Sequence, residues 1–282
     1  MAIARDATSF VQNSGTSATV AHTCTGTNLI LMVNAVNTSG NFSFTGMTYN
    51  GVSMTLVSSI FNATTGYYVS LWYLINPSTG THNIVATTSG NNSVSIGGIS
   101  YTGAKQSSQP DSFSSTSQTA STSATYNTTV VANNSWLIMS GGADANATSW
   151  TAGTNTNLIQ NTANGVLIMD AIASVGTGSQ GLTFNYSGLH TTNAVIASIA
   201  PAPTTQNLTL SVATAVYSIA GQTVTISKFK QLVLNIATAV YNFTGFNIGA
   251  TFSGLINQTK PSTSWTNQNK PTTNWTNQAK NT

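Results

Sequence analysis

Hydrophobic residues in this chain occur in short blocks separated by turn-forming residues. The longest blocks, such as Leu29–Val33 and Ala194–Ala202, fall well short of the roughly 18 apolar residues that indicate a membrane-spanning helix. Helical periodicity is lacking, and strong helix formers are scarce. Strand-sized blocks that recur about every 8–12 residues are typical of a β-sandwich or barrel. The pattern therefore predicts an all-β fold.

The clearest hairpin in the sequence is centred on Asn50-Gly51. Asn-Gly supplies the positive φ angles of a type I′ turn, and alternating residues flank it on both sides. A strand rich in aromatic and β-branched residues follows at 67–74, and the segment 76–80 (Asn-Pro-Ser-Thr-Gly) predicts a tight turn after it.

Residues 105–123 consist mainly of Ser, Thr and Gln and predict a long loop between two halves of one domain. Strand patterns resume at 124–131 and continue to 194–200, which brings the expected total to about a dozen strands. Two packed sheets in a jelly-roll-like β-sandwich account for that number. Prolines at 201 and 203 predict the end of this domain, which spans residues 1–202.

The C-terminal part of the chain is repetitive at two levels. Residues 208–221 recur 24 positions later at 232–245, and a ten-residue unit beginning Asn-Gln starts at 257, 267 and 277. Fixed periods indicate small structural units that stack on neighbours or on a partner. We expect two short β repeats over 203–256, followed by an extended repeat tail over 257–282.

Charge is scarce and unevenly distributed. Only 4% of residues are charged, and there is no Glu. Residues 1–202 hold two basic residues against four Asp, a net charge of −2, whereas residues 203–282 hold five Lys and no acid, a net charge of +5. Nucleic-acid binders cluster Lys and Arg among aromatic residues, and these lysines are too widely spaced for that. The tail is better suited to an acidic protein surface.

Cysteine content and the N-terminus indicate where the chain works. Cys24 is the single cysteine, so an internal disulfide is excluded and a buried structural thiol is expected. The first residues lack the basic start and apolar core of a secretory signal. A neutral surface of hydroxyls and amides without an export signal fits a virion protein that is made in the host cytoplasm and released by lysis.

The sequence offers little catalytic chemistry. Four scattered Asp could form a glycosidase pair only if folding brought two of them together, with Asp144 and Asp170 as the pair to consider. Asp170 lies in an apolar strand-like run, where a hydrogen-bonded structural role is the alternative. His22, His82 and His190 make a serine triad possible in composition, but no Gly-x-Ser-x-Gly motif and no phosphate-binding glycine loop occurs.

Oxygen side chains alternate along residues 144–148, as in calcium loops. A single carboxylate binds a divalent cation poorly, and turn formation by Asp and Asn explains the same residues. We therefore expect no catalytic residue, no metal site and no cofactor.

Aromatic residues suggest two kinds of contact. Tyr68, Trp72 and Trp150 are candidates for stacking on a glycan, with burial in the sandwich core as the alternative. The C-terminal aromatic and basic residues lie in segments that cannot form a core alone, so we expect either assembly and anchoring or a disordered tail. The assembly candidates are Tyr217, Tyr241, Trp265, Lys270, Trp275 and Lys280.

Several segments resemble known structural proteins. The segments 48–57, 70–80 and 97–103, and the later segments 134–138 and 194–200, are similar to a β-sandwich module of bacterial surface proteins and phage structural proteins. The 24-residue units, with Val-Tyr-x-Φ-x-Gly, and the Trp-Thr-Asn-Gln-x-Lys decapeptides resemble repeats of tailed-bacteriophage virion proteins. The resemblance implies a fold and a setting, and it implies no catalytic residue.

These observations together predict a non-enzymatic structural protein of a phage virion. We expect a tail fibre or tail-associated protein whose sandwich binds a host-surface glycan and whose repeats assemble or anchor it. The expected partners are further copies of the chain, as a trimer, and other virion proteins; nucleic acid and membrane insertion are not expected. A capsid decoration protein without a receptor role and a bacterial extracellular adhesin or fibre subunit are the alternatives.

Overall fold

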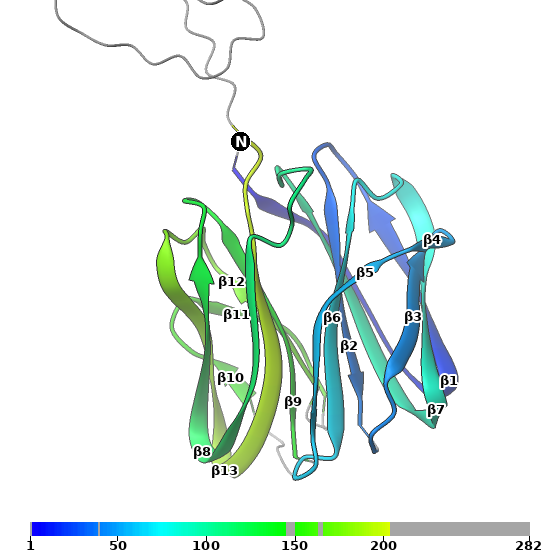
Figure 1. Cartoon of the computed structure of the whole chain (residues 1–282), viewed down its shortest axis with the longest axis vertical. Coiled ribbons are helices and arrows are strands. Elements are labelled where there is room, and N and C mark those ends of the chain that lie inside the picture. Colours follow the sequence, from blue (N-terminus) through cyan, green and yellow to red (C-terminus); the bar gives the residue numbers. More distant parts are fainter. Residues whose placement is uncertain (1, 39, 145–149, 163–165, 204–282) are drawn as a thin grey trace, which may run out of the picture. The chain divides into compact units, whose positions relative to one another are not determined.

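The computed structural model describes residues 2–38, 40–144, 150–162 and 166–203, which we call the body. Within the body every regular element is a β-strand, so the all-β prediction is confirmed (Figure 1). Seven strands form the first sheet and six form the second. The first sheet consists of β1 (Ala4–Cys24), β2 (Ile30–Asn37), β3 (Phe44–Tyr49), β4 (Val52–Ser53), β5 (Thr55–Asn62), β6 (Tyr67–Ile75) and β7 (Gly80–Thr102). The second sheet consists of β8 (Ser112–Val130), β9 (Trp136–Ala143), β10 (Trp150–Ala152), β11 (Thr156–Asn161), β12 (Val166–Ala171) and β13 (Gly178–Ile199).

Both sheets are antiparallel and share one order of strands. The first runs β4-β3-β7-β2-β6-β5 with β1 also paired to β7, and the second runs β10-β13-β9-β12-β11 with β8 also paired to β13. Each strand of the second sheet has a counterpart at the same place in the first. The pairs are β3 and β10, β7 and β13, β2 and β9, β6 and β12, β5 and β11, and β1 and β8. Only β4 has no counterpart. The body therefore consists of two halves with the same topology.

The register of the strands makes the halves comparable residue by residue. Gly80 pairs with Cys24 at one end of β7, and Gly178 pairs with Val130 at the same end of β13; both glycines have φ of +98°. At the other end, Ile30 pairs with Tyr101 and Trp136 pairs with Ile199. Residues at corresponding register positions are called equivalent below.

Each half encloses its own hydrophobic core because its longest strands bend. β7 pairs with β3 through residues 84–88 and with β2 through residues 94–101, and apolar residues of both parts meet in one cluster with Tyr49 and Trp72. β13 pairs with β10 and β9 in the same way, and the cluster inside the second half contains Tyr126, Trp150 and Phe184.

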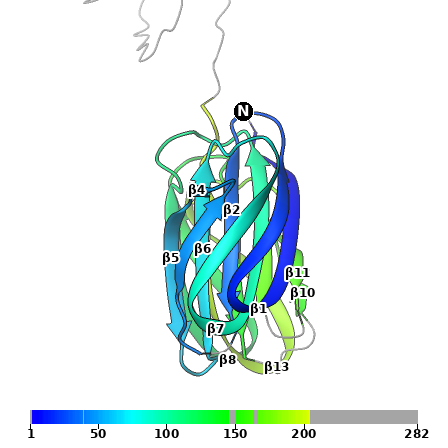
Figure 2. The same ribbon diagram turned by 90° about the vertical axis from the view of Figure 1, so that its right-hand side faces the viewer.

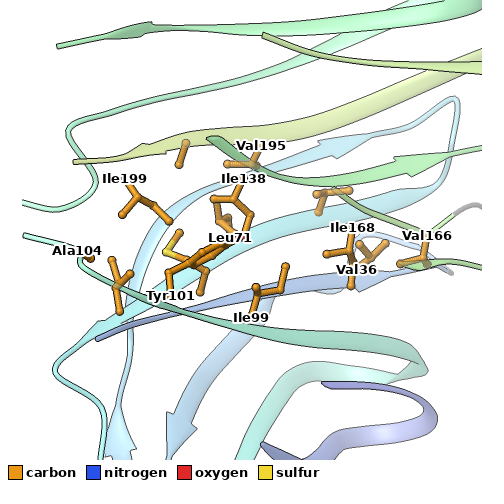
Figure 3. Close-up of a cluster of buried hydrophobic side chains, with 14 of the residues drawn as sticks. Val36, Leu71, Ile99, Tyr101, Ala104, Ile138, Val166, Ile168, Val195 and Ile199 are labelled. Atoms are coloured by element: carbon orange, nitrogen blue, oxygen red, sulfur yellow. The ribbon is translucent and has the colours of Figure 1, made fainter. Parts of the chain in front are cut away.

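A third core lies between the halves. It contains apolar residues from β2, β6 and β7 of the first sheet and from β9, β12 and β13 of the second. Figure 3 shows Ile138, Val195 and Ile199 gathered with Leu71, Ile99 and Tyr101. Figure 1 shows β2, β6 and β9 at the centre of the body, where this core lies, and Figure 2 shows the body with β1 and β7 of the first half toward the viewer. Burial of apolar area on both sides holds the halves together.

Two local predictions have clear outcomes. Asn50 and Gly51 have φ of +48° and +76° between the paired residues Tyr49 and Val52, so the predicted hairpin is confirmed. The predicted loop over 105–123 is wrong from Ser112 onward, because this segment begins β8 and pairs with the last part of β13. Ser and Thr are common both on the solvent-facing side of an edge strand and in loops. Composition alone therefore did not distinguish a strand from a loop in this segment.

Candidate functional site

The carboxylate of Asp170 in β12 is fully buried and accepts hydrogen bonds from four other residues. Arg5 of β1 donates from Nε at 2.9 Å and from Nη2 at 2.5 Å. The other donors are Tyr101 Oη at 2.9 Å, Trp136 Nε1 at 3.2 Å and Asn157 Nδ2 at 3.1 Å. Asp170 therefore joins β1 and β7 of the first half to β9 and β11 of the second.

The Asp170 cluster is arranged to hold a negative charge. Burial lowers the pKa of Arg5, but its hydrogen bonds with Asp170 and the charge of that carboxylate outweigh burial and raise the pKa overall. Burial and the neighbouring Asp170 raise the pKa of Tyr101, so its hydroxyl stays protonated and remains a donor. A carboxylate with five hydrogen bonds from charged and neutral donors has no lone pair directed at a substrate. The structural alternative for Asp170 is confirmed.

A second network lies in the first half and contains a partly buried aspartate, a buried serine and a buried histidine. Asp6 accepts hydrogen bonds from Thr25 and, at 2.7 Å, from the hydroxyl of Ser100. His22 contacts Ser100 Oγ through Nε2 at 3.1 Å and Ser9 Oγ through Nδ1 at 2.9 Å. The connected order is thus Asp6, Ser100, His22, Ser9.

The directions of these hydrogen bonds determine the protonation of His22. Because Ser100 donates its proton to Asp6, its oxygen accepts from Nε2–H of His22, and Nδ1 then accepts from Ser9. Burial lowers the pKa of His22 to about 4, while the charge of Asp6 acts in the opposite direction. No carboxylate contacts the ring directly, and the ring is 1% exposed. The network lacks the carboxylate–histidine contact of a serine triad.

A third network, around His190, stabilises the bend of β13. His190 contacts Asp144 through Nδ1 and the carbonyl oxygen of Ser187 through Nε2 at 3.0 Å. Asp144 also accepts a hydrogen bond from the backbone N–H of Thr191 at 3.1 Å. Asp144 therefore contacts His190, and Asp170 contacts Arg5, so the two acids considered as a glycosidase pair have separate partners.

The fourth acid, Asp111, precedes β8. Its Oδ2 accepts from the backbone N–H of Val131 at 3.3 Å, from that of Ala132 at 2.9 Å and from Ser135 Oγ at 3.4 Å. All four acidic residues of the chain are thus engaged with donors that belong to the fold. Among the described residues, His, Cys, Asp and Glu side chains nowhere gather in threes as a metal site requires. Cys24 is buried, as expected.

The structure places the predicted glycan-binding residues mainly inside the two cores. Trp72 is 8% exposed and donates from Nε1 to Ser70 Oγ at 3.0 Å. Trp150 is 6% exposed and packs on Phe184 and Tyr186 with ring centroids at 5.5 and 5.0 Å. Neither ring presents a free face to a sugar in this arrangement. Tyr68 is half-buried, and its hydroxyl contacts Ser59 Oγ at 3.0 Å. Glycan binding by these rings stays a prediction.

One shallow hollow lies where β1 and β11 face each other across the two halves. Its volume is about 170 Å³, and ligand pockets typically enclose roughly 300–1,000 Å³. The hollow contains no acidic, basic or imidazole side chain. The residues that line it are Thr8, Ser9, Phe10, Ile99, Ile159, Gln160 and Ile168.

Other predictions concern residues outside the body. Tyr217, Tyr241, Trp265, Lys270, Trp275 and Lys280 all lie outside the described residues, as do most positions of the suggested calcium loop. In the part of the chain that the structure describes, we find no helix with the length and apolarity needed to cross a membrane.

Sequence reasoning missed the partners of Asp170. Arg5 is the single arginine of the chain, and Asp170 is the single acid within an apolar strand-like run. Two opposite charges that are both isolated in such a neutral sequence are a signal for pairing, because a buried charge requires a partner. The hydrogen bonds that Asp170 accepts from Tyr101, Trp136 and Asn157 depend on strand order. No local sequence pattern indicated them.

Comparison with known proteins identifies no relative. No protein-family model, no curated protein and no solved structure matches the chain.

Proposed function

We propose that this chain is a non-enzymatic structural protein of a phage virion, a tail fibre or tail-associated protein. The body is a jelly-roll-like β-sandwich, and the C-terminal repeats assemble or anchor it. One observation supports a non-enzymatic role: each of the four Asp side chains accepts hydrogen bonds from groups that belong to the fold. General acid–base catalysis by a carboxylate and glycosidase chemistry both need a carboxylate that can reach a substrate.

The setting of the proposal rests on the sequence. A neutral surface, the short β repeats and the decapeptides that resemble virion repeats support a structural role in a particle. The five lysines beyond residue 202, with no acid beside them, suit an acidic protein partner. A host-surface glycan as ligand of the body belongs to the same proposal, with Tyr68 as the ring nearest the surface.

Mass spectrometry of gradient-purified virus particles tests membership of the virion. The chain should co-purify with particles at a fixed ratio to the major particle proteins. Particles that lack it entirely would overturn the proposal and favour the bacterial adhesin or fibre subunit.

The role of the repeats is tested by exchanging their tryptophans. The full-length double variant Trp265→Ala/Trp275→Ala should lose oligomer mass in sedimentation equilibrium or lose binding to particles. The matched control Thr266→Ala/Thr276→Ala changes the adjacent residue of each decapeptide and should retain both. Binding to empty capsids, with no binding to host cells, would favour the decoration protein.

A further inference from the structure

Aromatic rings gather at one end of the first half, near the loop between β2 and β3. Phe61 of β5 pairs with Tyr68 of β6, and facing residues of an antiparallel pair point to the same side of the sheet. Tyr68 in turn lies beside the buried Phe44 of β3, with ring centroids 6.5 Å apart. Phe61 and Tyr68 are half-buried, and Phe42, two residues before Phe44, is 38% exposed. We call Phe42, Phe61 and Tyr68 the aromatic lane.

Glycine backbone fixes the ring of Phe42. A Cβ added at Gly90 would lie 2.3 Å from both Cδ1 and Cε1 of Phe42 and 3.0 Å from its Cγ. A point that close to three adjacent ring atoms lies over the ring and not beyond its edge, so one face of Phe42 rests on Gly90. Two hydrogen bonds hold the loop, from Asn37 Nδ2 to the Phe42 oxygen at 3.2 Å and from the Gly40 N–H to the Gly66 oxygen at 3.0 Å. A ring held in this way loses little freedom when a ligand binds.

Hydroxyl groups accompany the rings of the aromatic lane. Tyr68 Oη contacts Ser59 Oγ of β5 at 3.0 Å. Thr88 Oγ1 donates at 2.7 Å to the carbonyl oxygen of Gly90, on which Phe42 rests. Aromatic faces next to a few hydroxyl groups suit a ligand that is itself partly apolar and partly hydroxylated.

Charge is absent from the part of the chain that forms the aromatic lane. Between Asp6 and Lys105 the sequence contains no Asp, Glu, Lys or Arg. The charge of Asp144, from the second half, reaches Tyr67 next to the lane, but the Asp144 carboxylate contacts His190. A charged ligand would lose its water here without gaining a free counter-charge, so the surroundings favour a neutral ligand.

The aromatic lane lies at the end of the body opposite to the one where the described chain ends. Ala104 pairs with Pro201 and donates to the Asn28 oxygen, just before β2 begins. β2 runs from there to Asn37, which pairs with Tyr68 of the lane. Figure 1 shows the N-terminus and the yellow end of the described chain at the top, and the connection from β2 to β3 at the bottom. A body attached through the repeats that follow it in sequence thus leaves the lane free.

We propose that the aromatic lane binds a neutral glycan, with a sugar ring stacked on the face of Phe42 opposite Gly90. Sugar C–H groups are attracted to the negative face of an aromatic ring, and sugar hydroxyls match the hydroxyls of Ser59 and Tyr68. A stable protein partner needs roughly 800 Å² on each side, more than three partly covered rings supply. This inference rests on the proposed function, whose host-surface ligand it narrows to an uncharged polymer and places at named residues.

Affinity electrophoresis of the full-length chain, in gels that contain a dissolved polysaccharide, tests the proposal. The neutral probes are dextran, galactomannan and starch, and the acidic probes are alginate and polygalacturonate. At least one neutral polymer should retard the chain, and Phe42→Ala should raise the dissociation constant for it roughly tenfold. The matched control Phe113→Ala removes a ring that is 54% exposed on the second sheet and should bind like the parent. Retardation by the acidic polymers, which the C-terminal lysines cause by charge, should not change in Phe42→Ala.

A second variant moves the ring of Phe42 without removing it. The methyl group added by Gly90→Ala occupies the space of the ring, so the ring must shift and binding to the neutral polymer should weaken as in Phe42→Ala. Gly176→Ala adds the same group where the nearest atom, Asn133 Oδ1, is 3.9 Å away, and should bind like the parent. Thermal unfolding of each variant checks that the body remains folded.

Two outcomes would overturn the proposal. One is retardation by none of the neutral polymers, or equal retardation of the parent and of the Phe42 and Gly90 variants. The other is retardation by gelatin, an extended polypeptide, that depends on Phe42, because the lane would then bind a peptide. Membership of the virion, measured by mass spectrometry of particles, would stand in both cases. A chain that binds a neutral polymer through Phe42 but is absent from particles would instead overturn the proposed function and leave the aromatic lane.

Discussion

The two halves of the body share one topology, but the carboxylates at one equivalent position, Asp6 and Asp111, accept different hydrogen bonds. Asp6 and Asp111 are equivalent because each precedes a residue at the register position of Ser100 or Ser198. In the first half Ser100 and Thr25 both donate to Asp6. In the second half Oδ1 of Asp111 and Oγ of Ser198 are buried without a hydrogen-bond partner among the described protein groups. Strand order alone therefore does not determine how many hydrogen bonds a carboxylate at a given register position accepts.

Two side-chain differences explain this contrast. Thr25, whose hydroxyl donates to Asp6 Oδ1, is replaced by Val131, which has no hydroxyl. His22, which contacts Ser100, is replaced by Thr128, whose hydroxyl donates to Ser112 instead. The same backbone thus supports a fully bonded network in one half and a partly bonded one in the other. A partly bonded buried network costs stability, and the difference can be measured.

The largest expected effect concerns Asp170, which has no acidic counterpart because Tyr73 is the equivalent residue. Asp170→Asn leaves the Arg5 guanidinium without its carboxylate, and removal of one partner of a buried pair costs about 3–5 kcal/mol. Urea unfolding of the full-length chain, followed by tryptophan fluorescence, measures the loss. Asp111→Asn makes the same change where fewer donors converge and should cost about 1 kcal/mol. Equal losses would mean that the cluster does not hold the halves together.

The next effect is a pH dependence that arises in the first half. In the folded chain burial lowers the pKa of His22 from 6.5 to about 4. Between these values the unfolded chain binds a proton at His22 and the folded chain does not. The free energy of unfolding should therefore fall as pH falls from about 6.5 to about 4, by on the order of 3 kcal/mol, and this contribution should stay constant below that range.

Substitution of single histidines isolates this contribution. His22→Gln should remove the slope of unfolding free energy against pH in that window, because an amide does not titrate. His82→Gln, which alters a histidine on the same sheet that contacts the carbonyl oxygen of Thr79 and packs edge-on against Tyr49, should keep it. A slope that survives in His22→Gln would assign the acid sensitivity to another group.

The comparison of halves also shows what the sequence allowed us to predict. Apolar blocks and turn residues were enough for the all-β class and for the Asn50-Gly51 hairpin, because both depend on local geometry. β1 and the part of β8 before residue 124 were missed because Ser, Thr and Gln alternate along them without an apolar face of their own over most of their length. Their pairing with β7 and β13 is long-range and leaves little local pattern.

In the candidate site, too, local features could be predicted from the sequence and long-range contacts could not. The structural role of Asp170 could be predicted from its apolar surroundings, whereas the approach of Arg5 to it depends on how the chain folds over a sequence separation of 165 positions. The equivalence of the halves also has a faint sequence signal that was not used. Ser17-Ala18-Thr19 recurs as Ser123-Ala124-Thr125 at equivalent positions of β1 and β8. Three residues are too few to establish a repeat without the register.

A smaller effect is expected at the hairpin that only the first half contains. Gly51 has φ of +76°, and a Cβ added there would meet no atom within 4 Å. Gly51→Ala should therefore cost only the backbone strain of a left-handed residue, about 1 kcal/mol. Gly141→Ala, in β9, adds a Cβ at ordinary contact distance of 3.5 Å from Leu167 without positive φ. Thermal unfolding should show a lower Tm for the first variant and little change for the second.

The smallest effects come from exchanging the residues that distinguish the two carboxylates. Val131→Thr offers Asp111 Oδ1 the hydroxyl that Asp6 receives from Thr25, and should raise the free energy of unfolding by about 0.5–1 kcal/mol. Thr25→Val should lower it by a similar amount. Val52→Thr, at a valine that is 50% exposed and lies far from any carboxylate in sequence, controls for the hydroxyl itself. Stabilisation by Val52→Thr equal to that by Val131→Thr would contradict the explanation.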